Sequence, residues 1–215
     1  YDVTITDTIP AGTTFVFATI PGTELGGIVT WLLGPKTAPV NGTVHLIVSV
    51  NSYEPWADTV VDYNPGLQKG GGTLPAESMD ASQALSADID NDAAPINFVS
   101  LGFGGDLVLG FNNYILDGAG ADIHVIETSW GNPTAAAYPE KLEVFASKNG
   151  TTWVSLGVQT RSEVSHDNDF DLNGALGWAK YLKLVDATDA AWGGGGSDAD
   201  GYDVAAVQAL HSAPS

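Results

Sequence analysis

The stretch Leu107–Glu127 constrains the fold most, because it reads as a strand, a glycine-rich turn and a second strand. Leu107, Leu109 and Phe111 occupy every second position, and the same period of two returns over residues 123–127. A period of two is typical of β-strands and does not fit a helix. The glycines of the turn allow backbone conformations that other residues avoid. A chain with such a stretch is expected to fold around β-sheet.

Short runs of the same kind recur along the chain after residue 53. They predict strands at 58–63, 98–103, 107–111, 123–128, 141–147, 152–156, 180–185 and 204–210. No helical pattern of 10–15 residues separates them, and strands at this spacing indicate a sandwich or jelly roll. Residues 64–97 are rich in Gly, Pro, Ser and Asp, and a loop of this length in a compact domain is usually functional.

The distribution of acidic residues divides the chain in two. Residues 1–52 contain only Asp2, Asp7 and Glu24, so 23 of the 26 acidic residues lie in 53–215. We therefore predict two domains with a boundary between residues 52 and 53. Strands are also expected in the first domain, at its start and over 14–19, 26–33 and 43–50.

The first domain resembles the Ig-like repeat of bacterial and archaeal surface proteins. The matching segments are Val3–Phe15, Thr30–Gly34 and Thr43–Val50. Such repeats begin with one or two further strands, which are absent here, so the resemblance implies an incomplete sandwich. Either a neighbouring subunit supplies the missing strands, or the chain has been trimmed, or the domain closes with fewer strands. A spacer or scaffold role is implied.

The second domain is similar to the discoidin or galactose-binding type of jelly roll. The segment Glu143–Gly157 carries the most specific match, a strand, a turn and a strand with Trp153. Ser100–Gly105, Asp117–Asp122 and Asp200–Asp203 also fit. The resemblance implies binding, adhesion or assembly. The expected fold is all-β, a partial Ig-like β-sandwich followed by a jelly-roll β-sandwich.

Composition excludes several classes of partner. The chain has 26 acidic and 7 basic residues, a net charge of −19, which repels nucleic acid and anionic membranes. The absence of cysteine removes thiol chemistry and thiolate metal sites. No apolar run approaches the ~18–20 residues of a membrane span. We expect no nucleic acid partner and no membrane insertion.

Two acidic turns predict a calcium-stabilised edge. One turn runs from Asp117 to Asp122, and the other, 198–203, opens the last apolar strand. Calcium takes six to eight oxygen ligands from carboxylates and backbone carbonyls, and strand ends offer further acids. The candidate ligands are Asp117, Asp122, Glu127, Asp186, Asp198, Asp200 and Asp203. The alternative is two ordinary surface turns, in which Asp side chains bond to backbone N–H groups.

Aromatic residues in loops form a second candidate site. Exposed aromatic rings stack on sugars or on partner proteins. The candidates are Trp130, Tyr138, Trp178, Trp192 and Tyr202, which lie beside Gly, Pro or Ala stretches. The alternative is that these aromatic residues cover the hydrophobic core and contact no ligand. Trp31 and Trp153 lie within alternating runs and are expected to be buried.

Sequence motifs of catalysis are mostly missing. The chain has no G-x-S-x-G, no phosphate-binding loop and no His-Glu-x-x-His. Glu140 with Glu143, or Glu127 with an Asp, would suit a glycosidase only by chance in so acidic a chain. The four histidines show no metal-ligand spacing.

The function expected first is therefore a non-enzymatic structural or adhesive protein of the cell surface, extracellular and calcium-stabilised. It would form an assembly or filament with copies of itself or with neighbouring surface proteins. The alternatives are a carbohydrate-binding module that uses the loop aromatics to hold glycans, and a glycan-active enzyme.

Overall fold

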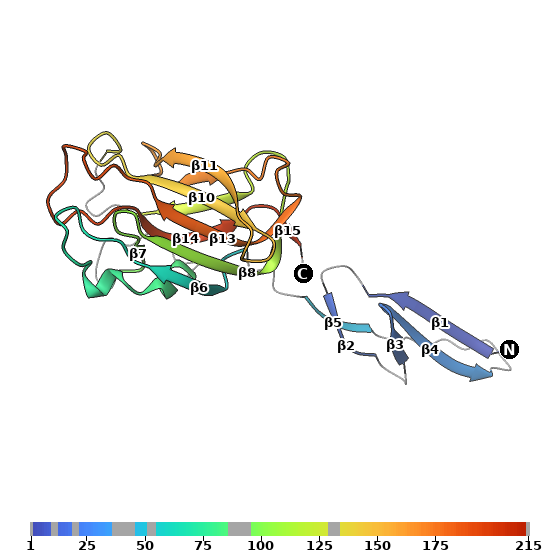
Figure 1. Cartoon of the computed structure of the whole chain (residues 1–215). Coiled ribbons are helices and arrows are strands. Elements are labelled where there is room, and N and C mark those ends of the chain that lie inside the picture. The colour runs from blue at the N-terminus through green and yellow to red at the C-terminus, as the bar shows by residue number, and fades with distance from the viewer. Residues whose placement is uncertain are drawn as a thin grey trace. The chain divides into compact units, whose positions relative to one another are not determined.

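The computed structural model describes residues 2–9, 13–18, 22–35, 46–50, 55–85, 96–128 and 134–213. The chain divides into two compact units, residues 1–53 and 54–215 (Figure 1). The predicted all-β class is confirmed, because the described residues form antiparallel sheets and two short 3-10 helices. No helix in these ranges is long and apolar enough to span a membrane.

The first unit contains two small sheets. One has the order β1-β4-β3, from Asp2–Thr8, Ile28–Pro35 and Gly22–Leu25, and the other pairs β2 (Thr13–Ala18) with β5 (Leu46–Val50). β3 and β4 form a hairpin whose turn, Gly26–Gly27, has positive φ at both residues. Glycine adopts that conformation without a steric penalty, and two-residue hairpin turns require it.

Trp31 is buried at 1% exposure, as predicted, and is the largest buried side chain among the described residues of the first unit. Leu25 and Leu32 on the same sheet are 84% and 70% exposed. The described strands do not identify an Ig-like fold specifically, so that assignment stays a prediction. The first three residues of the strand predicted over 43–50 lie outside the described residues.

The second unit is built on two antiparallel sheets. The larger has the order β11-β10-β13-β8, and the free edge of β8 pairs with β6 along its first half and with β15 near its end. The smaller has the order β12-β9-β14-β7. The strands of the larger sheet are β6 Thr59–Asn64, β8 Asp106–Leu116, β10 Lys141–Ser147, β11 Val154–Thr160, β13 Trp178–Asp186 and β15 Ser212–Ala213. Those of the smaller are β7 Val99–Ser100, β9 Ile123–Glu127, β12 Asn168–Phe170 and β14 Asp203–Ala209.

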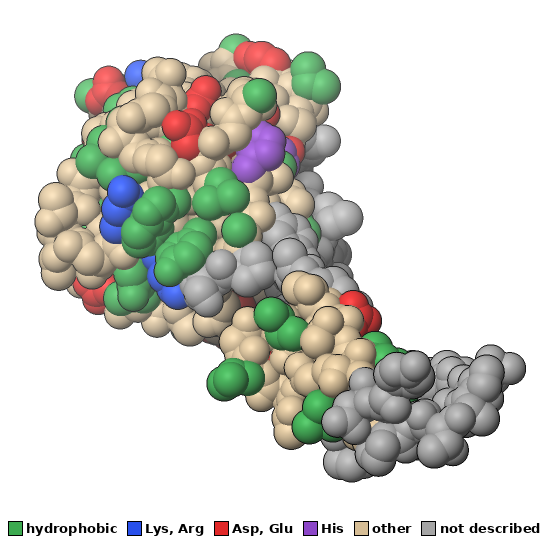
Figure 2. All heavy atoms as spheres, turned by 90° about the vertical axis from the view of Figure 1, so that its right-hand side faces the viewer, with side chains coloured by type: hydrophobic (Ala, Val, Ile, Leu, Met, Phe, Trp, Pro, Cys, Tyr) green, Lys and Arg blue, Asp and Glu red, His purple; other side chains and the backbone are tan. Residues whose placement is uncertain are grey.

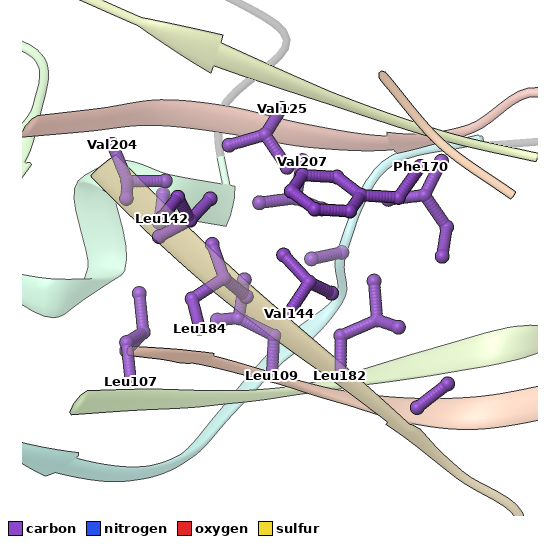
Figure 3. Packing of buried hydrophobic residues seen from close by; sticks show 14 of the residues in the cluster. Leu107, Leu109, Val125, Leu142, Val144, Phe170, Leu182, Leu184, Val204 and Val207 are labelled. Carbon is purple, nitrogen blue, oxygen red and sulfur yellow. The ribbon is translucent and has the colours of Figure 1, made fainter. Parts of the chain in front are cut away.

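Alternation along the strands places one hydrophobic face of each sheet in the core. On β10, Leu142, Val144 and Ala146 are fully buried while the residues between them are half-buried. Figure 3 shows side chains of β8, β10 and β13 facing those of β9, β12 and β14, with Phe170 and Val125 on the second side. The core therefore lies between the two sheets.

Three local features differ from the sequence prediction. The long loop contains the 3-10 helices η1 (Ala76–Ser78) and η2 (Ala81–Leu85), and Ala84 of η2 joins the core. The short β12 was not predicted. Trp153 lies one residue before β11 and is half-buried, with the Lys183 ammonium 5.7 Å from its ring centroid. The prediction that Trp153 lies in the core is therefore wrong, because the positions of this strand that face the core were assigned one residue too early.

The turn Asp117–Asp122 does not close a hairpin. β8 before it and β9 after it belong to different sheets. The turn instead carries the chain across one end of the sandwich, which determines where its acidic residues lie.

Candidate functional site

The structure separates the predicted acidic residues into two groups at opposite ends of the second unit. We call these the Asp122 end, where β9 and β13 begin, and the Asp203 end, where β14 begins. Asp122 precedes β9 and Glu127 closes it, so the ends are roughly 16 Å apart along this five-residue strand. Asp117 and Asp122 thus lie at one end, and Glu127, Asp186, Asp198, Asp200 and Asp203 at the other. The two acidic turns do not form a single edge, contrary to the prediction.

Three carboxylates gather at the Asp122 end. Asp117, Asp122 and Asp171 each offer an oxygen within 4.8 Å of the others, a spacing that could hold a metal ion. Asp122 is fully buried, and it accepts hydrogen bonds from the backbone N–H of Gly118 at 2.7 Å and of Leu172 at 2.8 Å. Burial raises the pKa of Asp122, but these bonds and His211 outweigh it, so the pKa of this carboxyl lies below its usual value. Asp122 is therefore a fixed anion.

His211 contacts this cluster from the C-terminal side. Its Nδ1 lies 2.9 Å from the Asp122 carboxylate, and 40% of its side chain is exposed. Asp117 and Asp171 are exposed as well, and they accept hydrogen bonds from the backbone of the facing turn 172–174. Carboxylate and imidazole groups thus reach solvent together at this end.

An aromatic pair borders the same end. The rings of Trp178 and Tyr114 lie with their centroids 4.6 Å apart at an angle of 56°, and both are half-buried. Trp178 pairs with Leu116 in the ladder between β13 and β8. The next residue, Asp117, donates its backbone N–H to the carbonyl of Gly177 at 3.3 Å. The backbone that carries Trp178 is therefore next to the turn that carries Asp117.

The Asp203 end contains a buried carboxyl group beside a half-buried one, that of Asp200. Asp203 is 5% exposed, and its Oδ1 is buried with no hydrogen-bond partner. Burial, and then the neighbouring Asp200, raise the pKa of Asp203 well above its usual value. Asp200 accepts a 3.0 Å hydrogen bond from the Ser100 hydroxyl, and burial raises its pKa too. The unpartnered oxygen marks a place where a proton or a cation is favoured.

Tyr63 and Asp186 complete the surroundings of these carboxyls. The Tyr63 hydroxyl donates to the carbonyl of Ser100 at 2.6 Å, and burial followed by the charge of Asp203 raises its pKa to about 12. Asp186 accepts hydrogen bonds from the backbone N–H of Gly104 and Tyr202 and from the Thr188 hydroxyl. These donors engage both oxygens of Asp186, and its role as a metal ligand stays a prediction. Asp198 is exposed nearby.

A buried arginine holds Glu127. The Arg161 side chain is 0% exposed and lies 3.6 Å from Glu127 and 3.3 Å from Glu140, while its Nε donates to the carbonyl of Tyr138 at 2.8 Å. Buried charges need such partners, because an isolated ion loses its hydration. Glu127 and Glu140 are thus ion-paired within the sandwich.

The predicted loop aromatics fall into different environments. Trp192 and Tyr138 contact edge to face with centroids 5.0 Å apart at the Asp203 end. The Lys69 ammonium lies 4.4 Å from the Trp192 ring centroid and donates to the carbonyls of Trp192 and Gly194, fastening the loop. Tyr202 is fully buried, and its hydroxyl donates to Asn168, so its prediction as a ligand-facing aromatic is wrong. Trp130 lies outside the described residues.

Sequence reasoning missed several members of these groups. Asp171 opens an Asp-Leu-Asn-Gly turn, whose composition was a usable signal. No sequence signal marks Arg161 or Tyr114, because their roles depend on strands that are distant in the chain.

Comparisons with known proteins give a limited picture. No protein-family model and no curated protein matches the chain. Among solved structures, the C-terminal domain of a chitobiase from Bacteroides fragilis is similar at 16% identity and a TM-score of 0.45, covering 75% of this chain and 95% of that one. A family 32 carbohydrate-binding module from Clostridium perfringens in complex with galactose matches at 14% identity and a TM-score of 0.43, covering 64% and 88%. Similarity at this level assigns no function, so function is argued from this chain's own residues.

Proposed function

We propose that the second unit is a carbohydrate-binding module whose site is the Asp122 end. The observation that carries the proposal is the half-buried Trp178–Tyr114 pair, which lies on strands that adjoin the exposed Asp117 and Asp171 and the half-buried His211. The C–H face of a sugar stacks on an aromatic ring, and its hydroxyl groups bond to carboxylates and imidazole. Aromatic rings and polar side chains both occur at the Asp122 end.

The role is binding and not catalysis. The Asp122 carboxylate is held as an anion by backbone donors, and Glu127 and Glu140 are ion-paired to Arg161. None of these three is placed as a solvent-exposed general acid. Binding at an end of the sandwich also suits the extracellular surface protein expected from the sequence, which would adhere to glycans through its second unit.

A glycan array, followed by calorimetry on the best ligand, tests this function. Trp178→Ala should weaken binding about thirtyfold, because truncating a central aromatic contact costs about 2 kcal/mol. Trp192→Ala is the matched control, since it removes the same side chain at the opposite end and should leave affinity within a factor of two. Equal losses in both variants, or no glycan bound by the intact chain, would contradict the proposal.

A second function, calcium-dependent stabilisation, is favoured by Asp203. Its buried Oδ1 without a partner, next to the Asp200 carboxyl, fits a hard cation that takes oxygen ligands. Saturating calcium should stabilise the second unit by ~2–4 kcal/mol. Melting curves in calcium and in EDTA measure this difference, and Asp203→Asn should abolish it. Identical curves in the two buffers would dismiss the calcium site.

A further inference from the structure

The outer face of the larger sheet carries rings and lysines that the core does not use. β13 presents Trp178, Lys180, Tyr181 and Lys183 to this side, while Leu182 and Leu184 face the core. All four outward residues are half-buried. We define the outer aromatic face as Tyr114, Phe145, Trp153, Trp178 and Tyr181 with Lys148, Lys180 and Lys183.

Each lysine of this face lies over a ring. The Lys183 ammonium is 5.0 Å from the Phe145 ring centroid, and Lys180 is 5.2 Å from that of Tyr114. Lys148, from the hairpin after β10, lies 4.9 Å from that of Trp178. Such cation–π contacts hold an ammonium group in place without neutralising it. An anionic ligand would therefore meet cations that are already in position, and the lysine side chains would lose less conformational entropy when it binds.

The concentration of positive charge here is unusual for this chain. Three of its 7 basic residues lie on the outer aromatic face, although the net charge is −19. Lysine or arginine side chains are also visible among hydrophobic ones on the face shown in Figure 2. On an ordinary solvated surface, lysine side chains extend into water and do not lie over aromatic rings. This arrangement therefore favours an anionic ligand that also has apolar surfaces.

The spacing suits a polymer of charged sugars. Lys180 and Lys183 lie about 10 Å apart along β13, comparable with the length of a disaccharide. A polymer of uronic acids has one carboxylate and one apolar ring face per residue, so at this spacing every second carboxylate meets a lysine. Nucleic acid has a far denser charge, about one per 1.7 Å of duplex, and three lysines cannot offset its repulsion from so acidic a chain.

We propose that the outer aromatic face binds an anionic polysaccharide of the uronate class along β13, from Lys180 toward Lys183, which leads away from the carboxylates of the Asp122 end. Sugar rings stack on the exposed parts of the aromatic residues, and carboxylates pair with Lys180 and Lys183. This inference rests on the carbohydrate-binding function proposed above and adds the charge class of its ligand.

Calorimetry with two polymers that share one backbone tests the inference. Polygalacturonate has free carboxylates, whereas its methyl ester has the same rings without charge. The intact chain should bind polygalacturonate at least tenfold more tightly than the ester, and added salt should reduce this preference. The double variant Lys180→Gln, Lys183→Gln should lose roughly tenfold in affinity for polygalacturonate and none for the ester, which also shows that it is folded.

Lys141→Gln is the control for bulk charge. Lys141 lies at the far end of β10, over none of the rings described, so its loss should change affinity less than twofold. Equal binding of both polymers, abolished by Trp178→Ala, would overturn the anionic ligand and leave the carbohydrate function standing. Binding of neither polymer nor any other glycan would remove both. Tighter binding of an oligothymidylate or of anionic vesicles than of polygalacturonate would replace the polysaccharide with that partner.

Discussion

Replacing Arg161 with methionine should destabilise the second unit more than any surface substitution. The guanidinium is completely buried and lies 3.6 Å from Glu127 and 3.3 Å from Glu140. Methionine fills a similar volume but leaves two carboxylates in the interior without their cation. Removing one partner of a buried ion pair costs about 3–5 kcal/mol, because the remaining charge is not rehydrated.

The expected shift is easily measured. The unit spans residues 54–215, about 160 residues, and unfolding entropy near 2.1 cal/mol/K per residue gives about 0.34 kcal/mol/K. A loss of 4 kcal/mol then lowers Tm by about 12 °C. Scanning calorimetry on the whole chain gives this value, and urea unfolding followed by tryptophan fluorescence gives the free energy independently.

A triple variant separates charge from packing. Arg161→Met combined with Glu127→Gln and Glu140→Gln removes all three charges together, so it should recover most of the stability lost in the single variant. A single variant that loses less than 1 kcal/mol would refute the reasoning, because it would mean that water reaches the three groups. A triple variant no more stable than the single one would assign the loss to packing.

Three further predictions concern the core, a backbone crossing and pH. Leu184→Ala should cost about 3 kcal/mol in urea unfolding, because the side chain is fully buried, whereas Val158→Ala, 52% exposed, should cost under about 0.5 kcal/mol. Gly105→Ala should lower stability by about 1–3 kcal/mol, since its Cβ would lie 1.9 Å from the carbonyl oxygen of Leu101, and Gly193→Ala, which meets open space, should be neutral in the same melt. In EDTA, stability should fall as pH rises above about 4, because the raised pKa of Asp203 makes the folded state hold a proton that the unfolded state has released. Asp203→Asn should flatten this dependence, and a stability that instead rises with pH would contradict the assignment.

Much of the fold follows from the alternation of apolar residues. The predicted strand at 141–147 has the bounds of β10, and its half-buried and buried residues alternate from Lys141 to Ala146. β12 has only three residues, Asn-Asp-Phe, so a single apolar side chain marks it and no period can be recognised. The hairpin of β3 and β4 was also missed, although its Gly26–Gly27 turn is a recognised hairpin signal.

The candidate site was less predictable, because it depends on strand partners. The sequence shows acidic turns but not which end of the sandwich each turn occupies. Asp117 and Asp203 read alike in sequence, yet one is exposed and the other is buried with an unpartnered oxygen. Trp178 was a candidate from its loop position, but its partner Tyr114 comes from a strand more than sixty residues earlier.

The shared edge of β8 has a mechanical consequence. β6 begins at Thr59 opposite Gly110, and β15 ends at Ala213 opposite Tyr114. The two pairings lie about 13 Å apart along β8. Just before β6, the N–H of Ala57 bonds to the carbonyl of Val207, and the carbonyl of Pro55 accepts from the N–H of Ala209, both on β14. The segment that leads into β6 therefore bonds to the smaller sheet while β6 bonds to the larger one. A pull on the chain ahead of β6 would have to break these bonds to β14 before it could unzip the edge of β8.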